Sequence, residues 1–166
     1  MKRLAALMIL AAPLLASCGL RPLYADPSVG SPIGSLEQIV VGPIDERAGW
    51  LLRNALVDRL SGPENVAEPR YRLDVRIDDE ITRFGLRGDA GATRERRTLR
   101  ARYQLVDLAT GETLLDATAG SDAGIDITSS EYATLAAEQT AVERLAAEVA
   151  DDMVARLALY FRRSAE

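Results

Sequence analysis

The clearest pattern in the chain is a strict alternation of apolar and charged side chains over residues 70–78. Its apolar positions are Tyr71, Leu73, Val75 and Ile77. A strand with one face on a core and the other in water has this two-residue period, so a half-buried strand is predicted. The alternation returns over residues 99–105, at Leu99, Ala101, Tyr103 and Leu105. Residues 79–91 lose the pattern and contain three glycines, which predicts a loose connection between the two strands.

Two further strands follow from shorter signals. The β-branched run at residues 36–41 predicts a strand, which Gly42 and Pro43 end. Residues 113–121 alternate with small side chains on the inner side, and the preceding turn, DLATGE, carries a glycine where a left-handed residue is needed. The strand after this turn is therefore predicted to return antiparallel to the strand before it.

Two stretches have the helical period instead. The first is residues 46–60, with Asp45 as a cap and apolar residues at Ala48, Leu51, Leu52, Ala55, Leu56 and Leu60. The second follows Ser129 or Ser130 as a cap and carries apolar residues at Leu135, Val142, Leu145, Val149, Met153, Leu157 and Tyr160. Its polar side is acidic, which favours packing on a core over binding a membrane surface.

The order of these elements is β-α-β-β-β-α. It predicts an α+β sandwich, with two helices packed on one face of a four-stranded sheet. The other face of the sheet is expected to be polar, rich in arginine and uncovered.

Residues 1–18 have the pattern of an export signal that ends in a lipidation motif. Lys2 and Arg3 precede twelve uncharged residues, too few to span a bilayer as a helix. Leu15, Ala16 and Ser17 then lead to the only cysteine, Cys18, as in a bacterial lipobox. We expect cleavage of residues 1–17, lipid on Cys18, a flexible tether over residues 18–35 and a single domain over residues 36–166.

Composition excludes several classes of function. The net charge of −5 would become −7 on loss of Lys2 and Arg3, which argues against a general nucleic-acid binder. The chain has no histidine and no second cysteine, so we expect no His-based triad, no thiol nucleophile, no metal and no cofactor besides the covalent lipid. Carboxylates such as Asp78, Asp79 and Glu80 could carry acid–base chemistry, but their charge run at a strand end is typical of solvated turn residues.

The basic residues cluster in one part of the acidic chain. Seven arginines lie between Arg83 and Arg102, against only Asp89 and Glu95. Four of them fall on the polar side of the predicted strand: Arg94, Arg96, Arg100 and Arg102. Guanidinium groups bind phosphate through forked, charge-assisted hydrogen bonds, so this row could bind a phosphorylated ligand. It could instead pair with acids on neighbouring strands, contact a protein partner or face solvent.

Several segments together resemble the lipopolysaccharide-assembly lipoprotein family LptE. They are CGLRPLY after the lipobox, IVVGPIDERAGWLLRNALVDRL, the turn DLATGE, and YATLAAEQTAVERLAAEVADDMVARLALYF near the end. The resemblance implies an outer-membrane lipoprotein of Gram-negative bacteria that sits inside, and helps assemble, the lipopolysaccharide-translocating β-barrel LptD. It makes lipopolysaccharide and the barrel the expected partners of the four arginines. Gly19, in place of the aspartate that retains enteric lipoproteins in the inner membrane, fits outer-membrane sorting.

Two other functions stay open from the sequence. A lipidated α+β domain would also suit an auxiliary lipoprotein of an intermembrane lipid transporter. A periplasmic hydrolase that uses carboxylates such as Asp79 is the alternative from another class. Trp50, on the first predicted helix, is expected either at the edge of the core or in contact with the barrel.

Overall fold

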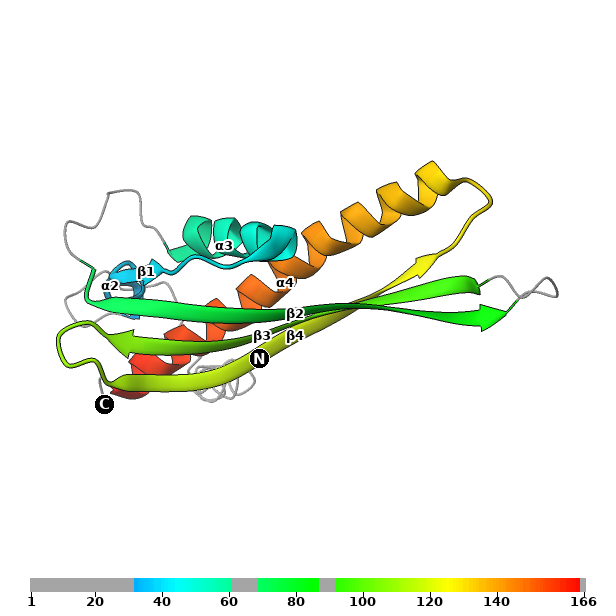
Figure 1. Cartoon of the computed structure of the whole chain (residues 1–166). Coiled ribbons are helices and arrows are strands. Elements are labelled where there is room, and N and C mark those ends of the chain that lie inside the picture. Colours follow the sequence, from blue (N-terminus) through cyan, green and yellow to red (C-terminus); the bar gives the residue numbers. More distant parts are fainter. Residues whose placement is uncertain (1–31, 61–68, 87–91, 165–166) are drawn as a thin grey trace, which may run out of the picture.

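The computed structural model describes residues 32–60, 69–86 and 92–164 of the 166-residue chain. Helices and strands follow one another in the predicted order, with one additional short helix at the start (Figure 1). They are α2 (Pro32–Leu36), β1 (Ile39–Val41), α3 (Glu46–Leu60), β2 (Tyr71–Leu86), β3 (Ala92–Asp107), β4 (Thr113–Asp126) and α4 (Glu131–Ser164). None of the helices in these described ranges is long and apolar enough to cross a membrane.

The four strands form one mixed sheet in the order β1-β2-β3-β4. β1 runs parallel to β2, and the other neighbours are antiparallel. The amide of Gly42 donates to the carbonyl of Leu73 at 3.0 Å, and the next residue, Pro43, has no N–H to continue this pairing. Between β3 and β4, Gly111 has a φ of +73°, so the predicted left-handed glycine and antiparallel return are confirmed.

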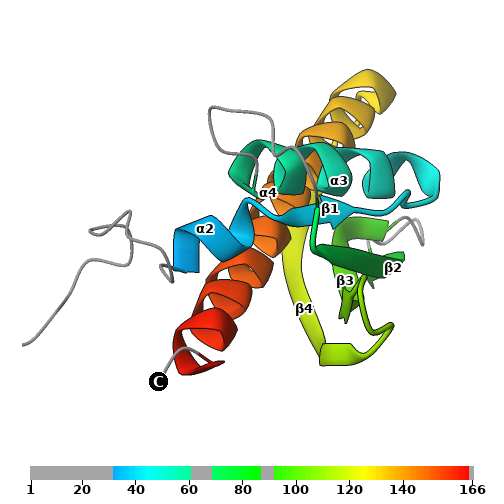
Figure 2. The same cartoon turned by 90° about the vertical axis from the view of Figure 1, so that its left-hand side faces the viewer.

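Both long helices lie on the same face of the sheet, and no element of the described residues covers the opposite face, which we call the uncovered face (Figures 1 and 2). This arrangement confirms the predicted α+β fold with helices on one side of a four-stranded sheet. The residues facing the helices are the predicted ones, since Leu99, Ala101, Tyr103 and Leu105 are all fully buried. The uncovered face is therefore formed by the polar rows of the same strands.

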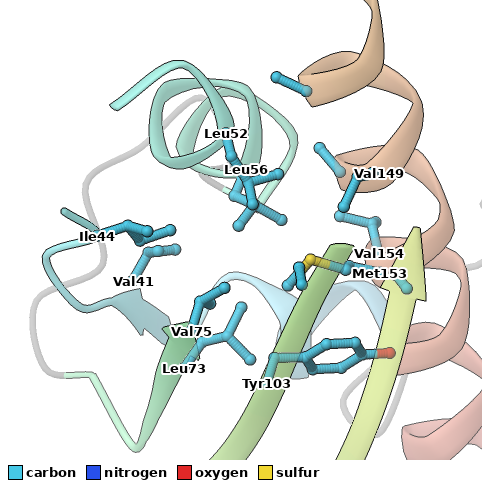
Figure 3. Close-up of a cluster of buried hydrophobic side chains, with 14 of the residues drawn as sticks. Val41, Ile44, Leu52, Leu56, Leu73, Val75, Tyr103, Val149, Met153 and Val154 are labelled. Atoms are coloured by element: carbon cyan, nitrogen blue, oxygen red, sulfur yellow. The ribbon is translucent and has the colours of Figure 1, made fainter. Parts of the chain in front are cut away.

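The core lies between α3, α4 and the sheet. Leu52 and Leu56 from α3 point toward Val75 on β2 and Met153 on α4 (Figure 3). Full burial of an aliphatic side chain stabilises a fold by about 1.5–3 kcal/mol, so this cluster is a main source of stability. Ser130 caps α4 as predicted, because its hydroxyl accepts a hydrogen bond from the amide of Ala133 at 3.4 Å.

Both ends of α4 differ from the prediction. Leu135 was expected in the core, but it is 59% exposed, and Tyr160, near the C-terminal end, is only half-buried. Figure 1 shows the reason for Leu135, since α4 rises away from the sheet toward its N-terminal end and extends beyond α3. A helix of 34 residues is about 51 Å long, whereas the 15 residues of α3 span only about 22 Å.

The strands are longer than predicted, and the start of the domain differs. β2 continues to Leu86 and β3 already begins at Ala92, so most of the expected loose connection is paired strand. Residues 32–35, expected at the end of the tether, belong to helix α2, and the first strand begins at Ile39 rather than at residue 36. The signal peptide, Cys18 and the tether up to residue 31 lie outside the described residues.

Candidate functional site

β3 carries the four predicted arginines on the uncovered face of the sheet. Because side chains alternate along a strand, even-numbered residues from 94 to 102 point away from the helices, and odd-numbered residues point toward them. Arg94, Arg96, Arg100 and Arg102 are all exposed, whereas Glu95 and Leu99 are buried. We call these four residues the arginine face. The structure brings them into one row, as the alternation predicts.

Three of the four arginines pair with acids of β4. Arg94 Nε lies 2.8 Å from Asp126 Oδ1, and Arg96 Nε lies 3.8 Å from Asp122 Oδ2. Arg102 donates two hydrogen bonds to the Asp116 carboxylate, at 2.8 and 3.1 Å. Pairing with acids on a neighbouring strand was one of the alternatives that the sequence left open, and it applies to three of the four arginines. Exposed ion pairs contribute at most about 1 kcal/mol, so a stronger anion could exchange with the aspartates.

Asp116 is the most perturbed carboxyl group on this face. Hydrogen bonds from Arg102, and next from the Gln104 amide at 2.9 Å, lower the pKa of Asp116 to about 2. The carboxylate therefore stays ionised under almost all conditions. Its two hydrogen bonds hold the Arg102 guanidinium next to β4.

Arg100 has a different environment. It lies opposite Asp78 on β2 and Gly120 on β4, and it forms no ion pair within the part of the chain that the structure describes. A Cβ atom on Gly120 would lie 3.2 Å from Arg100 Cγ, so the missing side chain leaves room for the arginine to lie across β4. The guanidinium is thus exposed without a carboxylate to neutralise it.

Two hollows border the middle of the sheet. The hollow of about 600 Å³ is lined by Asp152 and Arg156 of α4 and by the inward-facing Ile77, Ala101 and Ala119, so it reaches the helix-covered side of the sheet. The hollow of about 570 Å³ is bordered by Asp74, Arg76, Arg102 and Gln104 of the uncovered face, together with Pro43 and Val75. We call this second one the central hollow. It offers open space beside two guanidinium groups, with Arg100 next to Arg102 in the same row, which suits an anionic group such as a phosphate.

Arg76 is a residue that the sequence reasoning missed as a candidate. The alternation of β2 already predicts it on the polar side, but the pairing register needed to place it beside Arg102 could not be read from the sequence. Like Arg100, it forms no ion pair among the described residues. The central hollow is thus bordered by Arg76 and Arg102, and Arg100 lies next to it in the row, while Arg94 and Arg96 lie farther along β3 toward the β2–β3 hairpin end.

An aromatic ring accompanies the cations at the hairpin end. Phe84 is 42% exposed on β2, and the guanidinium carbon of Arg96 lies 5.8 Å from its ring centroid. Such a cation–π contact stabilises the pair by about 0.5–1 kcal/mol at an exposed site. The uncovered face therefore presents both charge and apolar surface, which is a combination that suits an amphiphilic ligand.

Not every arginine of this region lies on the uncovered face. Arg97 points toward the helices and donates two hydrogen bonds to Asp79, at 2.6 and 2.9 Å. Asp79 was expected to be a solvated turn residue, but it lies inside β2 and its side chain is almost fully buried in this ion pair. The pairing satisfies the carboxylate and removes Asp79 as a free acid or base for a hydrolase.

Trp50 can also be placed. It is 60% exposed on α3, so most of its side chain lies outside the core. Among the residues that the structure describes, no three acidic or cysteine side chains come together in a way that could hold a metal ion. Cys18, the predicted lipidation site, lies outside the described residues.

Comparison with known proteins places these features in a family. The sequence model of LptE, described as lipopolysaccharide-assembly, matches residues 36–157. No curated protein matches the chain.

Several solved structures share the fold. A chain from Caulobacter crescentus CB15, described as a lipoprotein, superposes with a TM-score of 0.67 at 23% identity, over 79% of this chain and 96% of that chain. Rare lipoprotein B from Shewanella oneidensis has a TM-score of 0.59 at 10% identity, over 77% and 98% of the two chains. Lipoprotein B from Nitrosomonas europaea has a TM-score of 0.56 at 11% identity, over 75% and 82%. At these identities the likeness concerns the fold.

Proposed function

Because the chain belongs to the LptE family of lipopolysaccharide-assembly proteins, we propose that it is an outer-membrane lipoprotein that assembles with an LptD-type β-barrel. In this proposal the domain plugs the barrel and supports the insertion of lipopolysaccharide in the outer leaflet. It acts by binding and positioning, and not as an enzyme.

The observation that carries the ligand part of the proposal is the central hollow of the uncovered face. Arg76 borders it without an ion pair among the described residues, and Arg102 borders it while paired with Asp116. Arg100, which also forms no ion pair among these residues, lies next to Arg102 in the same row. Lipopolysaccharide presents phosphate groups next to acyl chains on its lipid A part. Guanidinium groups form forked hydrogen bonds with phosphate, and Phe84 near the hairpin end supplies apolar surface on the same face.

The barrel part of the proposal concerns the exposed surface of the domain. Trp50 is a large apolar side chain exposed on α3, and buried tryptophans are frequent anchors of protein interfaces. The arginine face is the second candidate surface for barrel contact. Inside a barrel lumen both surfaces would face polar walls, which suits a sheet whose uncovered side carries cross-strand ion pairs.

The membrane anchor in this proposal is a lipid on Cys18. Two or three acyl chains hold a domain on a bilayer, because each buried methylene contributes about 0.8 kcal/mol. Expressed without a barrel, the Cys18→Ala variant should remain folded but leave the detergent phase in a phase-separation assay. An unchanged distribution of the variant would contradict lipid anchoring through Cys18.

Purification from native membranes tests the function as a whole. We expect the full chain to copurify with a very large β-barrel protein. Copurification with an inner-membrane transporter instead would contradict the proposal and favour an auxiliary role in lipid transport between membranes.

A variant with Gln at Arg94, Arg96, Arg100 and Arg102 then separates the roles of the arginine face. Reduced lipopolysaccharide affinity with a normal barrel yield indicates ligand contact, and the reverse indicates barrel contact. If both quantities match the wild type, the arginine face is only a solvated surface.

A further inference from the structure

Five charged side chains meet on the helix-facing side of the sheet, near the β2–β3 hairpin end. They are Asp79 and Arg83 from β2, Glu95 and Arg97 from β3, and Glu138 from α4. We call them the inner charge cluster. Two cations and three carboxyl groups leave one negative charge in excess when all five are ionised.

Arg97 connects the three elements. It donates to both oxygens of Asp79, and its Nη1 donates to the backbone carbonyl of Glu138 at 3.1 Å. One guanidinium therefore ties β2, β3 and the N-terminal part of α4 together. Its donors are used by Asp79 and a carbonyl, so Arg97 has little left with which to neutralise a further carboxylate.

Glu95 is the most deeply buried member of the cluster, and only one of its two carboxylate oxygens has a hydrogen-bond donor among the described residues. It is 1% exposed, and Arg83 Nε donates a hydrogen bond to its Oε1. The other oxygen, Oε2, is buried and has no hydrogen-bond donor among the described residues. A buried oxygen without a donor costs free energy, so the position calls for a hydrogen-bond donor nearby.

Glu138 faces Glu95 from α4. Partial burial, and next the neighbouring Glu95 carboxylate, raise the pKa of the Glu138 carboxyl above its ordinary value of 4.5. The charges of Arg83 and Arg97 act in the opposite direction without cancelling this effect. A protonated Glu138 has an O–H group to donate, which is what the free oxygen of Glu95 lacks.

We propose that Glu95 and Glu138 form a carboxyl–carboxylate pair that binds one proton, and that this proton fastens the N-terminal part of α4 to the hairpin end of the sheet. The proton also removes the excess negative charge of the cluster. From β4, this part of the face receives only the apolar side chains of Ala123 and Ile125, and no further titratable group. No metal-ligand set exists among the described residues to take the proton's place.

The direction of the pH dependence follows from the raised pKa. The folded chain holds this proton more tightly than the unfolded chain, so the stabilisation is complete below pH 4.5 and is lost as pH rises through the pKa of folded Glu138. Above that pKa, two carboxylates face each other and the first turns of α4 loosen. The same β3 segment carries Arg94 and Arg96 on its other side, so the proton also steadies the outer end of the arginine face.

Nuclear magnetic resonance of the full chain in detergent micelles, with ¹³C-labelled glutamate carboxyls, measures the pair directly. We expect the Glu138 carboxyl to titrate above pH 4.5 and to shift down in Glu95→Gln, because the amide would donate to the Glu138 carboxylate. Titration of wild-type Glu138 at or below pH 4.5, or an unchanged midpoint in folded Glu95→Gln, overturns the proposal.

Hydrogen exchange of the amides of residues 134–142 measures how stably the N-terminal part of α4 is held on the sheet. This measurement does not depend on whether Glu95→Gln folds. After correction for intrinsic exchange, protection in the wild type should fall as pH rises through the Glu138 midpoint. Glu138→Gln keeps a donor at every pH, so its protection should be independent of pH over this range. Glu143→Gln, at an exposed position of α4, is the matched control and should behave as the wild type does. Equal pH dependence in Glu138→Gln and the wild type overturns the proposal.

Discussion

Arg76 on β2 and Arg102 on β3 lie directly opposite each other in the sheet, and both side chains are exposed on its uncovered face. Like charges at directly opposed positions destabilise a strand pair. Asp116 offsets the positive charge of Arg102 through an ion pair, but no carboxylate of the described residues forms an ion pair with Arg76. An anion bound in the central hollow would lie between repelling cations and stabilise both.

This arrangement predicts which arginines matter for ligand binding. Replacing Arg76 and Arg100 with Gln should weaken lipopolysaccharide binding by about tenfold or more, because a hydrogen bond to a charged group contributes about 1.5–3 kcal/mol. Arg72→Gln is the matched control, since Arg72 already binds Asp74 at 2.9 Å and lines neither hollow. Affinity of the wild type should also fall with ionic strength more steeply than that of the double variant. Equal affinities of the two proteins would remove the hollow as a ligand site.

The pKa of Asp116 gives a second prediction. Because its folded-state pKa, about 2, is below the ordinary 3.8, the ion pair with Arg102 stabilises the fold above pH 3.8, and this contribution is lost as pH falls toward 2. Arg102→Gln should raise the pKa of Asp116 toward 3.8, as measured by carboxyl resonances. Arg144→Gln, which breaks an ion pair on α4 instead, should leave it unchanged. An Asp116 midpoint near 3.8 in the wild type would show that the hydrogen bonds do not persist in solution.

Gly49 allows the close approach of α3 to the preceding loop. A Cβ atom there would lie 2.6 Å from Ile44 Cγ2 and 3.1 Å from the Ile44 carbonyl carbon. Alanine favours a helix by about 1 kcal/mol over glycine, but overpacking typically costs about 1–3 kcal/mol. We expect the clash to prevail, so that Gly49→Ala lowers the free energy of unfolding in urea.

Gly34→Ala is the control for this prediction, because no atom lies within 4 Å of the added carbon. It should leave the free energy of unfolding unchanged or raise it slightly. A stabilised Gly49→Ala variant would mean that Ile44 moves aside without cost.

Replacing Tyr103 is expected to stabilise the fold, in contrast to replacing Gly49. Its ring is fully buried in the core, and its hydroxyl has no hydrogen-bond partner among the described residues. Burial raises the pKa of this hydroxyl. Tyr103→Phe removes the unsatisfied oxygen and should raise the free energy of unfolding by about 1 kcal/mol. The control Tyr132→Phe, at a highly exposed position, should have no effect, and a loss of stability in Tyr103→Phe would reveal a partner such as an ordered water.

The regular part of the fold could be predicted because its apolar residues keep one period. Leu99 to Leu105 alternate without interruption, and α3 has the predicted bounds, since Gly62 and Pro63 stop the pattern. The extensions of β2 and β3 could not be predicted, because their inner row changes from apolar residues to Asp79, Arg97 and Glu95. A strand that buries ion pairs has no hydrophobic period to read.

The candidate site was predictable only in its outline. Alternation places Arg94 to Arg102 on one face, but only the pairing register adds Arg76 and assigns aspartates to three of the four arginines. The exposure of Leu135 likewise depends on how α4 rises away from the sheet toward its N-terminal end (Figure 1). The strand register and the position of α4 over the sheet are set by tertiary packing, and they cannot be read from the pattern of a single sequence.

The sheet order β1-β2-β3-β4 repeats the order of the strands in the chain, and this has a consequence for folding kinetics. β2, β3 and β4 are neighbours through successive hairpins, so their pairing closes only short loops and we expect it to form early. Docking of α4 on α3 joins residues almost a hundred positions apart, as in the contact of Arg59 with Asp151, and we expect it late. Until it docks, the apolar side of a three-stranded sheet is open to water and to other chains. The interval before α4 docks is therefore when the protein is most prone to aggregate.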